Sequence, residues 1–184
     1  MSTTALIVIA ALAAAGIWLF NRLVRLRNRG ESAWSDIDVQ LKRRHDLVPN
    51  LVETVKGYAG HEQKTFSEVV AARGRAQAAA GPAASGRAEG DLTRMLGRLF
   101  AVAEAYPQLR ASENFLGLQR DLSVIEDAIQ NARRYYNAVV RDLNTACETF
   151  PSNLVASAFG FGKREYFELD ADAERSAPVV SVAS

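Results

Sequence analysis

The sequence predicts an all-α protein in which an N-terminal transmembrane helix precedes an antiparallel helical bundle of three to four segments. Every residue from Ala5 to Phe20 is apolar or glycine, which is typical of a helix inside a bilayer. Further along the chain, apolar residues recur at intervals of three and four, the spacing of one buried helix face. Alternation of the kind that predicts a strand is confined to residues 164–170. Long helices joined by short breaks pack as a bundle.

Composition narrows the function classes before any motif is considered. Lys and Arg total 22 against 21 Asp and Glu, so the chain lacks the basic excess expected of a nucleic-acid-binding protein. Cys147 is the only cysteine, which excludes an intrachain disulfide and a cysteine metal cluster. With 184 residues, the chain has room for an anchor and about one domain. We expect residues 1–21 to form the anchor, 22–170 the helical domain and 171–184 a disordered tail.

The apolar run is long enough to cross a membrane. Residues 3–21 carry no charge, and as a helix they would extend about 28 Å, close to the ~30 Å hydrocarbon core. A cleaved signal peptide is the alternative, but residues 1–4 contain no Lys or Arg, which such a peptide should have. The cations follow the run instead, which predicts an N-terminus outside and a domain in the cytoplasm. The arginines expected at the membrane interface are Arg22, Arg25, Arg27 and Arg29.

Apolar stripes and turn signals predict the helices of the domain in order. The first stripe covers residues 23–69. Residues 81–90, which are rich in glycine and contain a proline, predict an interhelix linker. Asp91 is then expected to cap a shorter helix that ends before Pro107. The second long stripe covers residues 115–150 and predicts the last long helix.

Polar residues interrupt these stripes at positions that a helix would bury. On the last long helix, Glu126, Arg133 and Asn137 share a face. An unpaired buried charge costs on the order of several kcal/mol, so we expect pairing across helices, with Arg133 bonded to Glu62 or Glu104. Three interpretations remain open: a network that holds the helices in register, a site for a ligand or partner, or simple exposure to solvent. The members on earlier helices are Arg44, Glu62, Arg73 and Glu104.

Pro49 lies inside the first of these helices. Because proline has no N–H, it leaves the carbonyl of His45 without its helical donor, and the helix should kink there. We expect the kink to turn Arg44 inward. Lys42, Arg43 and His45 would then lie on the convex outer side.

The sequence contains no catalytic or cofactor-binding constellation. Neither His45 nor His61 follows a glutamate by three residues, as a di-iron bundle requires. The pair His61 and Glu62 is not followed by a second zinc-ligating histidine, and "GFGK" at 160–163 lacks the spacing of a phosphate loop. Cys147 occupies a stripe position, where cysteine is usually an inert apolar residue. We therefore expect no enzyme, no cofactor, no metal and no small-molecule substrate.

Four stretches carry a pattern that is found in a known family. They are "LRNRGESAWSDIDVQLKRRHDLVPNLVETVKGYAGHE", "AEAYPQLRASENFLGLQRDL", "IEDAIQNARRYYNAVVRDLNTACETFP" and the closing "YFE". Together they resemble the LemA family of bacterial membrane proteins. The resemblance implies a single-pass protein of the inner membrane with an elongated helical domain in the cytoplasm. The family motif falls on Arg43, Arg44, Asp46, Leu47, Pro49, Asn50, Leu51, Glu104, Tyr106, Pro107, Glu126, Arg133, Tyr136 and Asn137.

The resemblance implies no established enzymatic activity. Genes of family members often lie near those of membrane metalloproteases, and one relative is associated with magnetosome formation. These associations point to membrane organisation or quality control.

Two hypotheses about function remain open. In the first, the protein is a self-associating scaffold that organises or remodels the membrane. Ala10 and Ala14, one helical turn apart, would let two anchors approach closely. In the second, it is a monomeric adaptor that presents its outer helix face, including residues 42–46, to another membrane protein such as a protease. Both hypotheses make the lipid bilayer a partner, and neither involves nucleic acid.

Overall fold

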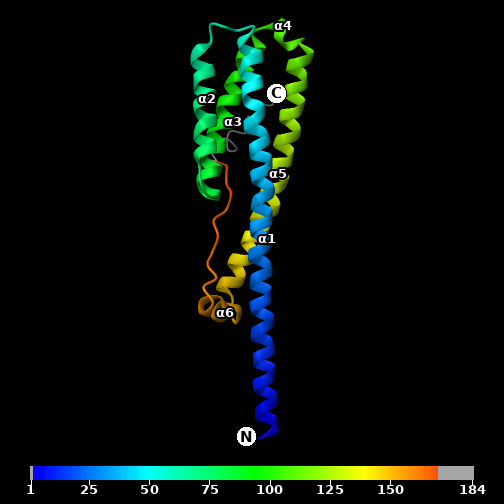
Figure 1. The fold of residues 1–184 in the computed structure, drawn as a ribbon, viewed down its shortest axis with the longest axis vertical. Helices are drawn as coiled ribbons and strands as arrows, with labels where there is room; N and C mark the ends of the chain where they lie inside the picture. The colour runs from blue at the N-terminus through cyan, green and yellow to red at the C-terminus, as the bar shows by residue number, and fades with distance from the viewer. Residues whose placement is uncertain (1, 170–184) are drawn as a thin grey trace, which may run out of the picture. The chain divides into compact units, whose positions relative to one another are not determined.

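The computed structural model describes residues 2–169, and every regular element in that range is a helix (Figure 1). The predicted all-α fold is confirmed: a long apolar N-terminal helix is followed by further helices. The candidate strand at 164–170 forms no strand up to residue 169. The segment 171–184, expected to be disordered, lies outside the described residues. The elements are α1 (Thr3–Lys56), α2 (Gln63–Ala78), α3 (Pro82–Glu104), α4 (Pro107–Arg110), α5 (Glu113–Glu148) and α6 (Ser152–Ala158).

The chain divides into two compact units, and α1 and α5 contribute residues to both. Unit 1 joins the chain up to Asp38 with Asn131–Tyr166. Unit 2 joins Val39–Gln130 with the described residues from Phe167 on. The predicted boundary between anchor and domain, at residues 21 and 22, does not coincide with this division and stays a prediction.

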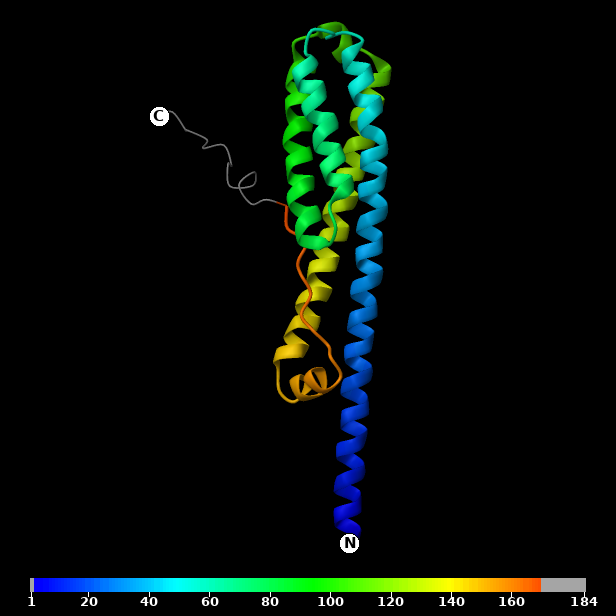
Figure 2. The same ribbon diagram turned by 60° about the vertical axis from the view of Figure 1, so that its left-hand side comes forward.

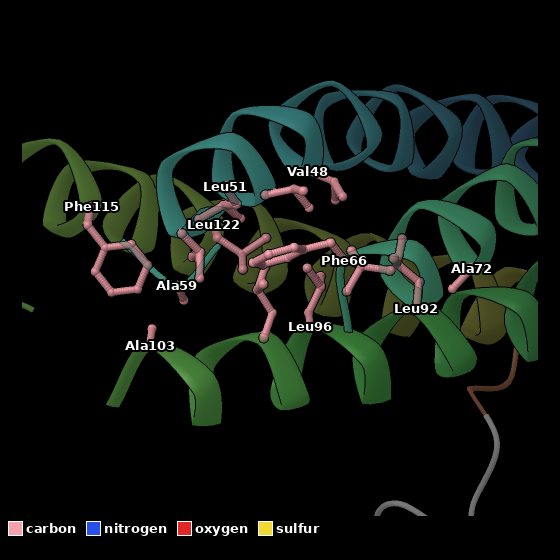
Figure 3. Packing of buried hydrophobic residues seen from close by; sticks show 14 of the residues in the cluster. Val48, Leu51, Ala59, Phe66, Ala72, Leu92, Leu96, Ala103, Phe115 and Leu122 are labelled. Atoms are coloured by element: carbon pink, nitrogen blue, oxygen red, sulfur yellow. The ribbon is translucent and has the colours of Figure 1, made fainter. Parts of the chain in front are cut away.

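Unit 2 is an up-and-down helical bundle, in which the long helices run alternately in opposite directions (Figures 1 and 2). Their apolar faces meet in one core, and Figure 3 shows how side chains from different helices interdigitate there. The three-and-four spacing in the sequence therefore marks faces that the fold buries. Core residues include Val48, Leu51, Val55, Phe66, Val69, Leu92, Leu96, Leu99, Phe115 and Leu122.

The first apolar stripe is divided between two helices. α1 ends at Lys56 and α2 begins at Gln63. The connection contains Gly57 and Gly60, and glycine readily leaves helical geometry. Glu62 is therefore exposed immediately before α2, and its expected place on a buried stripe is wrong.

The linker predicted at residues 81–90 is also wrong, because all but the first of these residues belong to α3. Pro82 occupies the first helical position, where its missing N–H removes no helical hydrogen bond, and Gly81 enters the helix with a φ of 84°. Gly86 is buried, and a Cβ on it would overlap the backbone carbonyl of Glu168. The glycine at this position permits close packing against the chain rather than a break in the helix.

In unit 1, α5 packs against α1 and also holds the chain that follows α6. The ring of Tyr136 lies 5.5 Å from that of Trp34, and its hydroxyl donates to the carbonyl of Glu165 at 2.9 Å. Asn144 donates to the Arg164 carbonyl at 3.0 Å and accepts the Arg164 N–H at 2.8 Å. The buried apolar residues of this unit include Leu23, Leu26, Leu143, Ala146 and Ala156.

The N-terminal part of α1 has a different environment. Within residues 2–169, α1 is the one helix long and apolar enough to cross a membrane. None of the side chains in its most apolar window is buried by the rest of the described chain. Ile7, Leu12 and Ile17 are among the large apolar side chains left exposed. Such a surface is typical of a helix that faces lipid.

Candidate functional site

Unit 2 encloses a cluster of charged side chains centred on Arg44 of α1. Arg44 is only 1% exposed. Its Nη1 donates to Oε2 of Glu89 on α3 at 3.0 Å, and its Nη2 lies 2.9 Å from Oε1 of Glu126 on α5. Nη2 also donates to the Thr93 hydroxyl at 2.7 Å. One guanidinium group therefore connects three helices, and we call these residues, with His45 and Arg73, the Arg44 cluster.

His45 and Arg73 extend the cluster to α2. Nε2 of His45 lies 2.6 Å from Oε1 of Glu89, so both carboxylate oxygens of Glu89 are engaged. Nε of Arg73, on α2, donates to the backbone carbonyl of His45 at 2.7 Å. This is the carbonyl that Pro49 leaves without a helical donor. A side chain of a neighbouring helix thus replaces the hydrogen bond that the proline removes.

Burial changes the protonation equilibrium of one member of the cluster, Glu126. It raises the pKa of the Glu126 carboxyl above its usual value of 4.5. Attraction to Arg44 offsets part of this rise, and repulsion from Glu89 and Asp127 adds to it. Taking ions out of water is unfavourable, and only close, hydrogen-bonded pairing offsets that penalty. Removal of one partner would therefore leave the others buried and uncompensated.

The chemistry of these groups favours a structural role. Both oxygens of Glu89 are already bonded within unit 2, which leaves neither free to act on a substrate. Among residues 2–169, no three His, Cys, Asp or Glu side chains are grouped so that they could hold a metal ion. In unit 1, burial raises the pKa of the Cys147 thiol and Glu148 adds to the shift, which disfavours the reactive thiolate. The Arg44 cluster can hold four helices in one register.

Several predicted residues lie on the outside of α1. Arg43, Asp46 and Asn50 are exposed, as is Pro49. Together with Leu47, the first three line a shallow groove of about 440 Å³ on unit 2. The opposite side of the groove belongs to α5 and consists of Asp121, Val124 and Ile125. Polar groups beside exposed apolar side chains are typical of a surface that binds a protein segment.

The remaining predicted residues are spread over both units. Glu104, the last residue of α3, is exposed. In unit 1, Tyr136 is buried, whereas Arg133 and Asn137 are half-buried. The pairing of Arg133 with Glu62 or Glu104 stays a prediction. The four arginines that follow the apolar run are all exposed: Arg22, Arg25, Arg27 and Arg29.

Sequence reasoning missed Glu89 and misplaced His45, both of which are buried. It placed Glu89 in a linker and His45 on the outer side of α1. A signal for Glu89 was available, because it precedes Leu92 by three residues and Leu96 by seven, the spacing of a buried face. The same signal existed for His45, which precedes Val48 by three residues and Val52 by seven, but the expected kink led to its placement on the outer side of α1.

Comparison with known proteins identifies the family. The profile of the LemA family matches residues 33–182, most of the chain and every member of the Arg44 cluster. The chain belongs to the LemA family. The resemblance seen in the motifs is thereby confirmed, and the apolar N-terminal helix fits a membrane-associated helical protein of this family.

LemA-family relatives with curated names come from several bacteria. Magnetosome proteins MamQ 1 and MamQ 2 of Paramagnetospirillum magneticum are each 27% identical over 175 residues, which covers 81% of this chain and 64% of theirs. Protein LemA of Metamycoplasma hominis is 28% identical over 137 residues, which covers 74% of this chain and 63% of its own length. The chain therefore spans slightly less than two thirds of the length of these relatives.

Proposed function

We propose that this LemA-family protein is a non-enzymatic, membrane-anchored scaffold that self-associates and organises or remodels the bacterial inner membrane. The observation that carries the proposal is the apolar part of α1, none of whose side chains is buried by the rest of the described chain. Such a surface is stable only against lipid or other apolar helices. The arginines that follow it favour an N-terminus outside and the helical units in the cytoplasm.

Two further observations support association between copies. Ala10 and Ala14 lie on one face of the anchor, and Ala11 and Ala15 on the next. Small residues at this spacing let transmembrane helices approach closely. Two of the relatives are named magnetosome proteins, which supports a role in building a cellular structure.

The interior of unit 2 supports a role without catalysis. Arg44 is bonded both to Glu89, at 3.0 Å, and to Glu126, at 2.9 Å. A general acid or base must reach the proton that it transfers. Here the carboxylates of Glu89 and Glu126 instead face the Arg44 guanidinium and hold helices together.

The second candidate is a monomeric adaptor, and the groove between α1 and α5 in unit 2 favours it. The groove combines Arg43, Asp46 and Asn50 with Val124, whose side chain is 68% exposed. A segment of another membrane protein, such as a protease, could bury Val124 and satisfy the charges at the rim.

The molecular mass of the full chain separates the two candidates. We would measure it by light scattering in a mild detergent, beside a chain that lacks residues 2–21. This truncation keeps Leu23 and Leu26, which belong to the core of unit 1, so loss of assembly would not reflect loss of that core. Circular dichroism should show that both proteins remain helical.

A scaffold predicts one defined assembly for the full chain and a smaller species without the anchor. One pair of alanines should lie between the associated anchors. Replacing that pair by leucine, either Ala10 and Ala14 or Ala11 and Ala15, should then weaken the assembly. A monomer in both proteins overturns the scaffold. Crosslinking from Val124→Cys, in a Cys147→Ala background, would then test whether the groove holds a partner.

A further inference from the structure

In unit 1, residues 150–159, which include α6, expose several large apolar side chains. Phe150, Leu154 and Phe159 are 75%, 61% and 65% exposed. The surrounding stretch, residues 149–163, contains no acidic residue and one lysine. Single exposed apolar residues are ordinary in a soluble protein, but several together mark a surface with a partner.

α6 is apolar on the side that faces the protein and also on the side that does not. Ala156 is buried in the core of unit 1 against Leu23 and Leu143. Leu154, two residues earlier on this short helix, points away from that core and is exposed. A large apolar side chain that lies opposite the packed face of a helix favours an apolar environment on that side as well. The described chain supplies that environment on one side.

Ring contacts place this region beside the inner end of the anchor. The ring of Phe159 lies 4.8 Å from that of Phe20, and the ring of Phe161 lies 5.7 Å from it. Phe20 is the last residue of the unbroken apolar run of α1. In Figures 1 and 2, α6 lies beside the blue, N-terminal half of α1. The exposed side chains therefore occur where the anchor enters the protein.

Cations surround the same place. The guanidinium of Arg27 lies 5.3 Å from the centre of the Phe161 ring, and that of Arg22 lies 5.8 Å from the Trp18 ring. Aromatic rings and basic side chains together are typical of the membrane–water interface, where rings enter the headgroup layer and cations meet phosphates.

We infer that residues 150–159, the α6 corner, form a second membrane contact that enters the headgroup and acyl boundary beside the anchor. Lipid is the occupant because this surface packs on Phe20, at the end of the apolar run, where a membrane-spanning helix enters the headgroup layer. The inference rests on the anchor crossing a membrane and is independent of self-association. It gives unit 1 two attachments, which together restrict its rotation about the membrane normal.

The test uses the full chain in nanodiscs that hold one protein each. A fluorophore is attached at Leu154→Cys in a Cys147→Ala background, and quenching is compared for nitroxide-labelled lipids and aqueous iodide. Tyr135→Cys is the matched control, because Tyr135 is also an exposed side chain of unit 1. Its neighbour Tyr136 contacts Trp34, and Trp34 lies about 21 Å beyond Phe20 along α1. Position 135 should therefore lie well away from the lipid.

The expected result is loss of about half or more of the emission at position 154 with nitroxide lipids and little loss at position 135, because interfacial helices lie about 5–10 Å deep. Aqueous iodide should quench the fluorophore at position 135 more than the fluorophore at position 154. Equal lipid quenching at both positions overturns the inference. Protection of position 154 from iodide without lipid quenching also overturns it, because protein would then cover the corner. Phe150→Cys repeats the measurement if Leu154→Cys alters the circular dichroism.

The outcome is separable from the assembly measurement. A protein that is monomeric by light scattering can still show lipid quenching at position 154. An assembled protein can equally show none. Failure of one proposal therefore does not decide the other.

Discussion

Units 1 and 2 draw on the same two long helices, yet they distribute polarity in opposite ways. Unit 2 buries charges, with Arg44 and Glu89 almost inaccessible to solvent. Unit 1 has a small apolar interior and leaves Phe150 and Phe159 outside. The contrast shows that polar and apolar groups have different roles in the two units. Unit 2 uses internal charges to define which helix faces meet, and unit 1 uses external apolar groups for attachment.

The largest effect should come from breaking the charge network of unit 2. Arg44→Met should lower the free energy of unfolding by about 3–5 kcal/mol, because it leaves Glu89 buried without its cation. Arg43→Met is the matched control on the exposed side of α1, and it should change stability by less than about 0.5 kcal/mol. Urea unfolding of the solubilised chain measures both.

The same network allows a second test of the mechanism. Adding Glu89→Gln to Arg44→Met should recover part of the lost stability, because a neutral amide is less costly to bury than a carboxylate. Equal losses for Arg44→Met and Arg43→Met would show that buried charge does not distinguish unit 2.

A smaller effect is expected from the close packing of α3. Gly86→Ala should destabilise unit 2 by about 1–3 kcal/mol, because the new methyl group meets the backbone at Glu168. Gly97→Ala on the same helix, with nothing within 4 Å of its Cβ position, should instead stabilise by about 0.5–1 kcal/mol. Thermal unfolding of the two variants should shift in opposite directions. Two shifts of the same sign would contradict this explanation of the corrected linker.

In unit 1, the backbone after α6 depends on one amide side chain. Asn144→Ala removes both hydrogen bonds to Arg164, so opening of this segment should become easier by about 1–2 kcal/mol. Hydrogen exchange at the Arg164 amide should therefore accelerate about tenfold or more. Thr145→Ala, at the exposed neighbouring position, should leave that exchange unchanged. Unaltered exchange in Asn144→Ala would mean that other contacts hold the segment.

The smallest effect should be a pH dependence confined to unit 2. Burial raises the pKa of Glu126 above 4.5, so the folded chain holds this proton more tightly than the unfolded chain. The resulting stabilisation is fully present below 4.5 and is lost as the pH rises through the raised value. Glu126→Gln cannot ionise and should lose less stability over that range. If the free energy of unfolding changed equally with pH in the unaltered chain and in Glu126→Gln, this would contradict the raised pKa.

The positions of buried faces could be read from the sequence because helix periodicity is local. The spacing from Val48 to Val55 and from Leu92 to Leu99 marks core residues wherever the helix packs. The apolar run of α1 is equally local, because bilayer thickness sets the length that it needs. The helical class and the candidate anchor follow from these short-range properties alone.

Tertiary structure decided which polar groups meet and what the glycines do. Arg44 and Glu89 are forty-five residues apart, and no periodicity within one helix identifies a partner at that distance. Residues 81–90 contain glycines, which favour a break in a helix. The backbone at Glu168 nevertheless approaches α3 so closely at Gly86 that a side chain there would overlap it, so glycine fits inside this helix. Local propensity is a weak preference of about 1 kcal/mol per residue, and packing between distant segments exceeds it. The sequence by itself determined the helical class and the long apolar N-terminal helix, because both depend on local pattern. Three-dimensional packing decided where glycine-rich segments stay helical and which charges pair.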